Sequence, residues 1–230
     1  MPHENYAFLT HKLLKSFDQA VSRVKPIVIS RYGEEANNLI QQSRQKFTGL
    51  IPQIPYIGEN NPLLDFFYFP ASRHLGIYQA FQENGKTLEE TGQLVYEIGC
   101  AEIKAIPGLV RRLIKLIWFS RWFTKRLQKR AALSQERKYP GAYLVAYHKG
   151  YGKAFDFQFD YLECAVLNFY RQQGAAALVP YICAIDKVAS ELLGWGLCRT
   201  MTLAEGGTKC DFRFKKGGKT FITVTQSLQK

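Results

Sequence analysis

Hydrophobic residues in the first half of the chain recur at the spacing of amphipathic helices. Residues 5–24 place apolar side chains at helical intervals, which predicts a helix, and residues 33–47 repeat the pattern. The prolines within 51–58 interrupt it, because a proline lacks the backbone donor and favours an extended residue before it. A further apolar helix is predicted over 62–82.

The next helices are marked by their start signals. Thr87 and Glu90 have the spacing of a capping box, and the helix that they start is predicted to run to about Ala105. Pro107 can be the first residue of another helix, since its missing amide hydrogen would have no partner there. We therefore expect a basic amphipathic helix near 107–133.

After residue 141 the hydrophobic period changes to that of strands. In 155–162 aromatic residues alternate with Asp and Gln, which predicts a strand with one buried aromatic face and one acidic face. Similar signals predict strands over 142–148, 197–203, 209–214 and 220–225, and helices over 166–172 and 180–193. The expected fold class is α+β, a helical N-terminal half packed on a mainly antiparallel sheet with helices in the C-terminal half.

The two kinds of pattern divide the chain into two unlike regions. Residues 1–135 form a helical region, and residues 136–230 form an α+β region that carries the cysteine and carboxylate motifs. At 230 residues the chain can hold one core with a helical extension or two domains. We expect one compact unit.

The positive net charge bears on which binding partners the protein could have. The formal net charge is +12, and residues 103–133 contain nine Lys or Arg and no Asp or Glu. The segment 107–130 has the composition of a helix on an anionic membrane surface, but we favour a helix packed on the core with a solvated basic face and keep peripheral membrane contact as the alternative. No nucleic-acid reading module accompanies the charge, so a nucleic-acid partner is not expected.

The cysteine pattern and the termini indicate the compartment. The five cysteines include no CxxC pair, which argues against a zinc finger, and disulfides are not expected in a reducing compartment. The first residues lack the features of a signal peptide, and no stretch approaches the roughly 20 apolar residues that span a bilayer. The expected location is the cytoplasm.

Several sequence blocks resemble a known enzyme family. They are, in chain order, YIGENNPLL, ENGKTLEETGQLVYE, SQERKYPG, FDFQFDYLEC, VPYICAIDKV and GLCRTMTLAEGGTKCDFRFKKG. These blocks are similar to those of the L-2-amino-thiazoline-4-carboxylic acid hydrolase family, most specifically in the last third of the chain. The resemblance implies a hydrolase that opens a small C–N/C–S heterocycle, a five-membered 2-aminothiazoline ring, on a route to L-cysteine. The basic segment before Ser134 has no counterpart in these blocks.

Opening such a ring needs a nucleophile, an acid and a cation for the substrate carboxylate. Cys164, which follows Glu163 at the end of a predicted strand, is the first choice for the nucleophile. A helix that starts there would place its N-terminal amides near the sulfur and depress the thiol pKa. The alternative is that Cys164 is a small buried core residue.

Two more segments supply catalytic candidates. Cys183 and Asp186 are three residues apart in a predicted helix, so the carboxylate could act on a proton held near the thiol. An ordinary ion pair or solvated residue is the alternative for Asp186. Cys210 alternates with aromatic residues, and Asp211 lies on the opposite face of the same strand.

Substrate-binding candidates are Arg199, Arg213, Glu205, Asp160 and Tyr161. Arg213 could clamp a carboxylate or form a salt bridge with Asp211 on its own face. Glu205 is either a turn residue before two glycines or a general base that points into a pocket.

Two alternatives to this chemistry remain. Three thiols and three carboxylates could converge on zinc, but without a close ligand pair we expect no metal and no cofactor. The competing function is a non-enzymatic protein of the same fold that binds a small apolar or anionic ligand, with the cysteines as packing residues.

Overall fold

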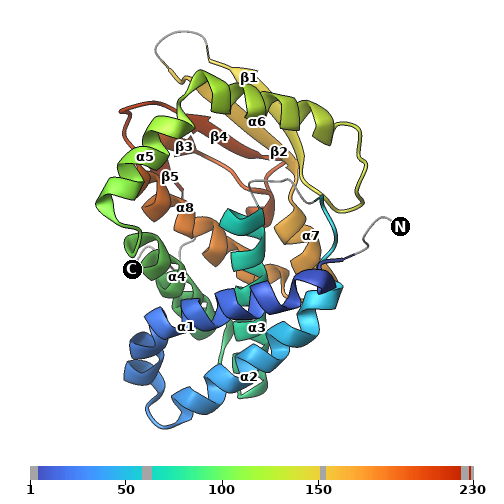
Figure 1. The fold of residues 1–230 in the computed structure, drawn as a ribbon, viewed down its shortest axis with the longest axis vertical. Helices are drawn as coiled ribbons and strands as arrows, with labels where there is room; N and C mark the ends of the chain where they lie inside the picture. The colour runs from blue at the N-terminus through green and yellow to red at the C-terminus, as the bar shows by residue number, and fades with distance from the viewer. Residues whose placement is uncertain (1–4, 59–63, 151–153, 224–227, 229–230) are drawn as a thin grey trace.

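The computed structural model describes residues 5–58, 64–150, 154–223 and 228, and its fold class is α+β as expected. Figure 1 shows the helices of the first half below a sheet built by the second half. The helices of the first half are α1 (Thr10–Tyr32), α2 (Glu35–Leu50), α3 (Phe69–Glu83) and α4 (Leu88–Lys104), with short turns at Ala7–Leu9, Ile51–Gln53 and Leu64–Tyr68. The start predicted for the third helix, at residue 62, lies outside the described residues.

The helix starts follow local hydrogen bonding. The Thr87 hydroxyl accepts a hydrogen bond from the Glu90 amide at 3.1 Å, so the predicted cap is confirmed. The basic segment forms two helices, α5 (Gly108–Trp118) and α6 (Arg121–Ser134), where one was expected. The break occurs because Ser120 is extended and its hydroxyl accepts from the Phe123 amide, which starts a new helix.

The sheet has five strands in the order β1-β2-β4-β3-β5. They are β1 (Leu144–Lys149), β2 (Phe157–Glu163), β3 (Leu197–Arg199), β4 (Cys210–Phe214) and β5 (Phe221–Ile222), and the helices between them are α7 (Ala165–Gln172) and α8 (Val179–Leu193), with short turns at Ala176–Leu178 and Leu203–Glu205. All neighbours are antiparallel except the parallel pair β3 and β5, so the mainly antiparallel sheet is confirmed.

The two faces of the sheet differ as the alternation in β2 predicts. Phe157, Phe159 and Phe214 are buried on one face, against residues from α5, α6 and α8. There Trp118 stacks on Trp195 with the ring centroids 4.5 Å apart. The opposite face carries the charged side chains.

A second hydrophobic core joins the first half of the chain to α7 and the start of α8. The buried hydroxyl of Tyr170 on α7 donates a 2.6 Å hydrogen bond to the carbonyl of Ala71 on α3. Helix α4 packs on α8, where Gly92 lies against the ring of Tyr181. Helix α7, which directly follows β2, therefore connects the sheet to the N-terminal helices.

Candidate functional site

Three cysteines from separate segments meet beside the sheet. Cys164 is the residue before α7, Cys183 lies on α8, and Cys210 begins β4. Cys164 acts to raise the pKa of both Cys183 and Cys210, Cys210 acts to raise that of Cys183, and Asp186 acts to raise all three, as expected for groups that lie near one another. We call these three cysteines, with Asp186 and Arg199, the thiol–carboxylate cluster.

Arg199 organises the cluster from β3. Its side chain is almost fully buried, and Nη1 donates to the carboxylate of Asp186 and, at 2.9 Å, to the carbonyl oxygen of Cys183. The guanidinium carbon lies 5.5 Å from the ring centroid of Phe212. Its buried Nε has no hydrogen-bond partner among the described residues. One donor of this cation thus stays available inside the protein.

Asp186 is a carboxyl group with a proton affinity suited to catalysis. Burial raises its pKa to about 6, although the positive charge of Arg199 acts to lower it. The side chain is only 17% exposed, so the carboxyl group is largely surrounded by protein. Such a group can both accept and return a proton near neutral pH.

The thiols are less acidic than expected. Burial raises the pKa of Cys164 above its ordinary value, while the amides of Val166 and Leu167 at the start of α7 act to lower it. The prediction of a depressed pKa for Cys164 is therefore wrong, because desolvation outweighs the helix N-terminus. The predicted place of Cys164 at a helix start is right.

The other two thiols are also held in the protonated form. Burial raises the pKa of Cys210 to about 12, against the effect of the Leu203 amide, which donates to its sulfur at 3.2 Å. Burial places the pKa of Cys183 well above its usual value. A sulfur nucleophile in this cluster therefore needs a base beside it.

Tyrosine rings form a wall of the cluster. Tyr143 and Tyr161 have ring centroids 5.8 Å apart, and Tyr68 lies 6.3 Å from Tyr143. Burial raises the pKa of each phenol, and Cys164 raises it further. Tyr161 was a predicted site residue, whereas Tyr68 and Tyr143 were missed, because no motif marks them and Tyr68 is remote in sequence.

A cavity of about 770 Å³ is lined by Tyr143 but by none of the five residues of the cluster. Glu163 lines it as well, and its carboxylate accepts a hydrogen bond from Arg137 Nη1 at 2.6 Å. The remaining wall comes from the end of α6, the segment 136–145 and residues 56–58. Tyr143 thus both lines the cavity and belongs to the tyrosine group beside the cluster.

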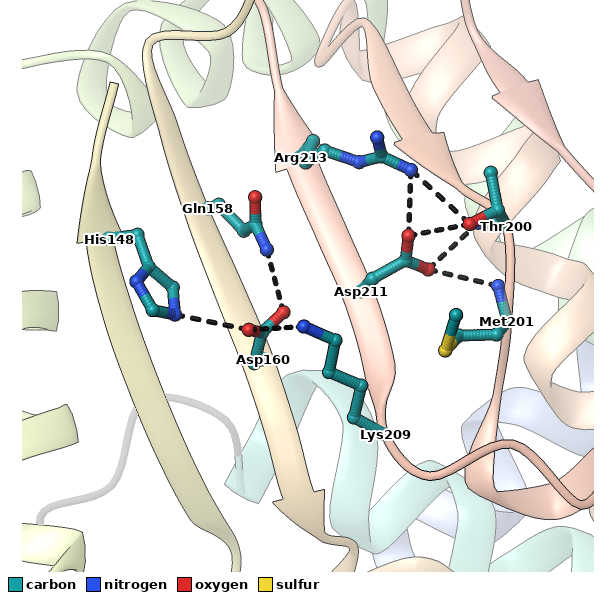
Figure 2. A network of polar contacts seen from close by, with 8 residues as sticks. All are labelled: His148, Gln158, Asp160, Thr200, Met201, Lys209, Asp211 and Arg213. Atoms are coloured by element: carbon teal, nitrogen blue, oxygen red, sulfur yellow. Dashed lines mark hydrogen bonds and ion pairs between the residues drawn. The ribbon is translucent and has the colours of Figure 1, made fainter. Parts of the chain in front are cut away.

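Two other predicted carboxylates lie on the opposite face of the sheet, away from the cluster. Asp160 and Asp211 are register partners on β2 and β4, and Figure 2 shows their carboxylates in two separate groups of polar contacts. Asp160 accepts from Lys209 at 2.8 Å, as well as from Gln158 and His148. The structure does not bring these carboxylates to the cysteines, because successive residues of a strand point to opposite faces.

The carboxylate of Asp211 accepts hydrogen bonds from several donors. It accepts hydrogen bonds from the amides of Thr200 and Met201, at 2.8 and 2.9 Å, and from Arg213 at 2.7 Å. Burial acts to raise the pKa of Asp211, but these bonds and the Thr200 hydroxyl lower it overall. Arg213 is thus paired as a salt bridge on its own face, the alternative that the sequence left open.

Glu205 has a local structural contact. The Thr202 hydroxyl lies 2.8 Å from its carboxylate, and the Glu205 amide donates back to that hydroxyl at 3.2 Å. Glu205 itself is exposed in the turn between β3 and β4, and Gly206 follows with a φ of 84°. The turn interpretation of these residues is therefore confirmed.

Within the described residues, no three His, Cys, Asp or Glu side chains are placed to share a metal ion. The cluster instead combines three thiols, one carboxyl of raised pKa and a buried guanidinium.

The fold and the cluster define an α+β protein with a thiol–carboxylate site. The sequence model of the L-2-amino-thiazoline-4-carboxylic acid hydrolase family matches residues 75–214, which include the whole cluster. The chain belongs to this family. No curated protein and no solved structure matches it.

Proposed function

We propose that the protein is a hydrolase that opens a small cyclic amidine of the 2-aminothiazoline type at the thiol–carboxylate cluster. Its family is one of hydrolases, named for a substrate with such a ring and a carboxylate. The observation that carries the proposal is Asp186, a carboxyl group of pKa about 6 held by Arg199 among three thiols. No comparable group is found among the paired carboxylates on the other face of the sheet.

In the proposed reaction Asp186 is the base and then the acid. It takes the proton from the nucleophile, Cys164 or a water molecule, as the nucleophile bonds to the carbon between the ring sulfur and nitrogens. A ring bond from that carbon to sulfur or nitrogen breaks, and Asp186 returns the proton to the departing atom. If Cys164 is the nucleophile, a water molecule then releases the carbon from the sulfur.

Arg199 is the group we assign to the substrate carboxylate. A planar guanidinium pairs well with a carboxylate, and the unpartnered Nε of Arg199 is buried beside the base. Arg213, the other predicted clamp, lies across the sheet and is already paired with Asp211. The substrate would therefore be oriented by Arg199 with its ring toward Cys164 and the tyrosine wall.

The cytoplasm is the setting we propose for this chemistry. All five cysteines are free thiols, as a reducing compartment would keep them. None of the helices that the structure describes is long and apolar enough to cross a membrane.

The test is turnover of L-2-amino-thiazoline-4-carboxylate by the purified protein, followed by free thiol release and by mass spectrometry of the product. We expect Cys164→Ser and Asp186→Asn to lower kcat by about 10²–10⁴-fold, the usual contribution of such groups. Cys198→Ser is the matched control, because Cys198 pairs with Arg213 in the sheet register and lies outside the cluster. It should keep full activity.

The possible outcomes test the assignment of the active site separately from the hydrolase function. Unchanged turnover in both variants would contradict the assignment of the cluster. Binding without turnover, measured by calorimetry, would favour the second function, a protein of the same fold that only binds a small ligand. The raised thiol pKa values favour that alternative, since protonated buried cysteines also serve as packing residues.

A further inference from the structure

Helix α5 exposes an apolar face that the core does not use. Leu109, Leu113 and Leu116 are 80, 56 and 63% exposed, and their spacing places them in one row along the helix. Val110 and Ile117, each exposed by more than 40%, widen the row. Isolated exposed leucines are ordinary on protein surfaces, but five apolar side chains on one helix face form a patch that marks an interaction site.

The other side of the same helix already packs on the protein. Ile114 and Trp118 are partly buried against the core under the sheet, where Trp118 stacks on Trp195. Anchoring the helix therefore does not require the exposed row. Figure 1 shows α5 at the edge of the molecule, followed by α6 across the sheet.

Cations surround the exposed row. Lys and Arg number nine between residues 103 and 133, with no Asp or Glu. Trp122, at the start of α6, is 64% exposed, and the guanidinium of Arg126 lies 5.6 Å from its ring centroid. Tryptophan and arginine together suit the boundary between lipid headgroups and acyl chains.

One of the cations has an internal role. Arg111 donates hydrogen bonds of 2.6 Å to the carbonyls of Ile106 and Lys104, at the end of α4. These bonds fix α5 against α4, so Arg111 is not free for an external anion. Arg112, Arg121 and Lys125 are exposed and remain available.

We propose that α5 and the start of α6 bind the surface of an anionic lipid bilayer, with the leucine row among the acyl chains and the cations at the lipid phosphates. The contact is peripheral. A second copy of the chain would fit the apolar row but would bring two acid-free basic segments together. An anionic bilayer matches both features of the helix, since its acyl chains accept the apolar row and its phosphates accept the cations.

The test is cosedimentation of the full chain with phosphatidylcholine vesicles that contain or lack phosphatidylglycerol. We expect binding to the anionic vesicles at low salt and weaker binding as salt increases. Leu113→Glu with Leu116→Glu should lower the partition coefficient by more than about tenfold, because apolar burial is lost and negative charge is added. Ile29→Glu is the control, since Ile29 is 43% exposed on α1 and should leave binding unchanged.

A charge variant separates the two contributions. Replacing Arg112, Arg121 and Lys125 with Gln should weaken binding at low salt while leaving the thermal unfolding midpoint within a few degrees. Absence of binding to anionic vesicles at low salt would overturn the proposal. So would equal binding by the double Leu variant, or a dimer in sedimentation analysis that the double variant abolishes, since the row would then be a contact between two copies.

Discussion

Three aspartates of this protein show how surroundings set the proton affinity of one side chain. Asp160 and Asp211 each accept hydrogen bonds from several donors, which lower their pKa values despite burial. Asp186 accepts from Arg199 as its one hydrogen-bond partner among the described residues, and the effect of burial on its pKa dominates. With few donors and strong desolvation, a carboxyl group has a pKa near neutral pH, where it can serve as an acid or a base.

The pH dependence of activity should report Asp186. As a base it must be ionised, so kcat/KM should rise with pH through about 6 and level off above it. Asp186→Asn should lower the rate and remove this limb, which steady-state rates from pH 4.5 to 8.5 would measure. A limb that persists unchanged in the variant would show that another group titrates.

The sequence predicted some parts of this site and could not predict others. The helical spacing of Cys183 and Asp186 places both on one face, and the structure agrees. The pairing of Arg199 with Asp186 joins a strand to a helix, so local spacing carries no sign of it. The direction in which the pKa of Cys164 shifts was predicted wrongly, because burial decides it. That burial depends on residues distant in sequence, such as Tyr68 and Tyr143.

At the scale of elements, the crossing of α4 and α8 depends on a missing side chain. A Cβ atom at Gly92 would lie 2.7 Å from ring atoms of Tyr181, well inside contact distance. The glycine therefore lets α4 approach α8, the helix that carries Cys183 and Asp186.

Two glycine substitutions should have opposite effects on stability. Gly92→Ala should lower the free energy of unfolding by about 1–3 kcal/mol, because overpacking outweighs the better helix propensity. Gly49→Ala, in α2, meets no atom within 4 Å and should raise it by about 0.5–1 kcal/mol. Urea unfolding of both variants measures this, and a stabilised Gly92→Ala protein would show that the helices can move apart without cost.

Element boundaries show the same division between local and distant causes. The cap at Thr87 and the end of α8 at Gly194 follow from local chemistry, and both were predicted correctly. The single helix expected near 107–133 divides at Ser120, although serine is itself a favoured cap residue. The strand predicted over 197–203 ends at Arg199, because Thr202 starts a short turn.

On the scale of the whole molecule, the fold class was predictable and the assembly of its parts was not. Period changes along the chain distinguish helices from strands. They do not reveal that α7, which follows β2 in sequence, packs with the helices of the first half. Nor do they say which face of the sheet the helices cover.

The stability of the molecule should fall in acid. Asp160 and Asp211 have folded pKa values below the ordinary value, so the stability they contribute is present above about pH 4 and is lost as the pH falls through their folded pKa values. Asp186 acts with the opposite sign, since its raised pKa favours the folded state as the pH falls from about 6.

Asp211→Asn should isolate one of these contributions. The variant should lose about 1–3 kcal/mol of unfolding free energy at pH 7 and show a smaller drop between pH 7 and pH 3 than the wild type. Asp65→Asn, which alters an exposed ion pair with Lys12, should leave both values near those of the wild type. An equal drop in all three proteins, measured by chemical unfolding, would place the acid sensitivity elsewhere.

Side chains of β4 point alternately to the two faces of the sheet, which limits how the sequence of this strand can change. Cys210 lies on the side of the strand that holds the thiols, and Asp211, the very next residue, lies on the charged side. A shift of β4 by one residue in its pairing with β2 would exchange the two faces and bring Asp211 to the side of the thiols. Substitutions can therefore diversify the charged side one residue at a time, whereas the register of β4 must stay fixed.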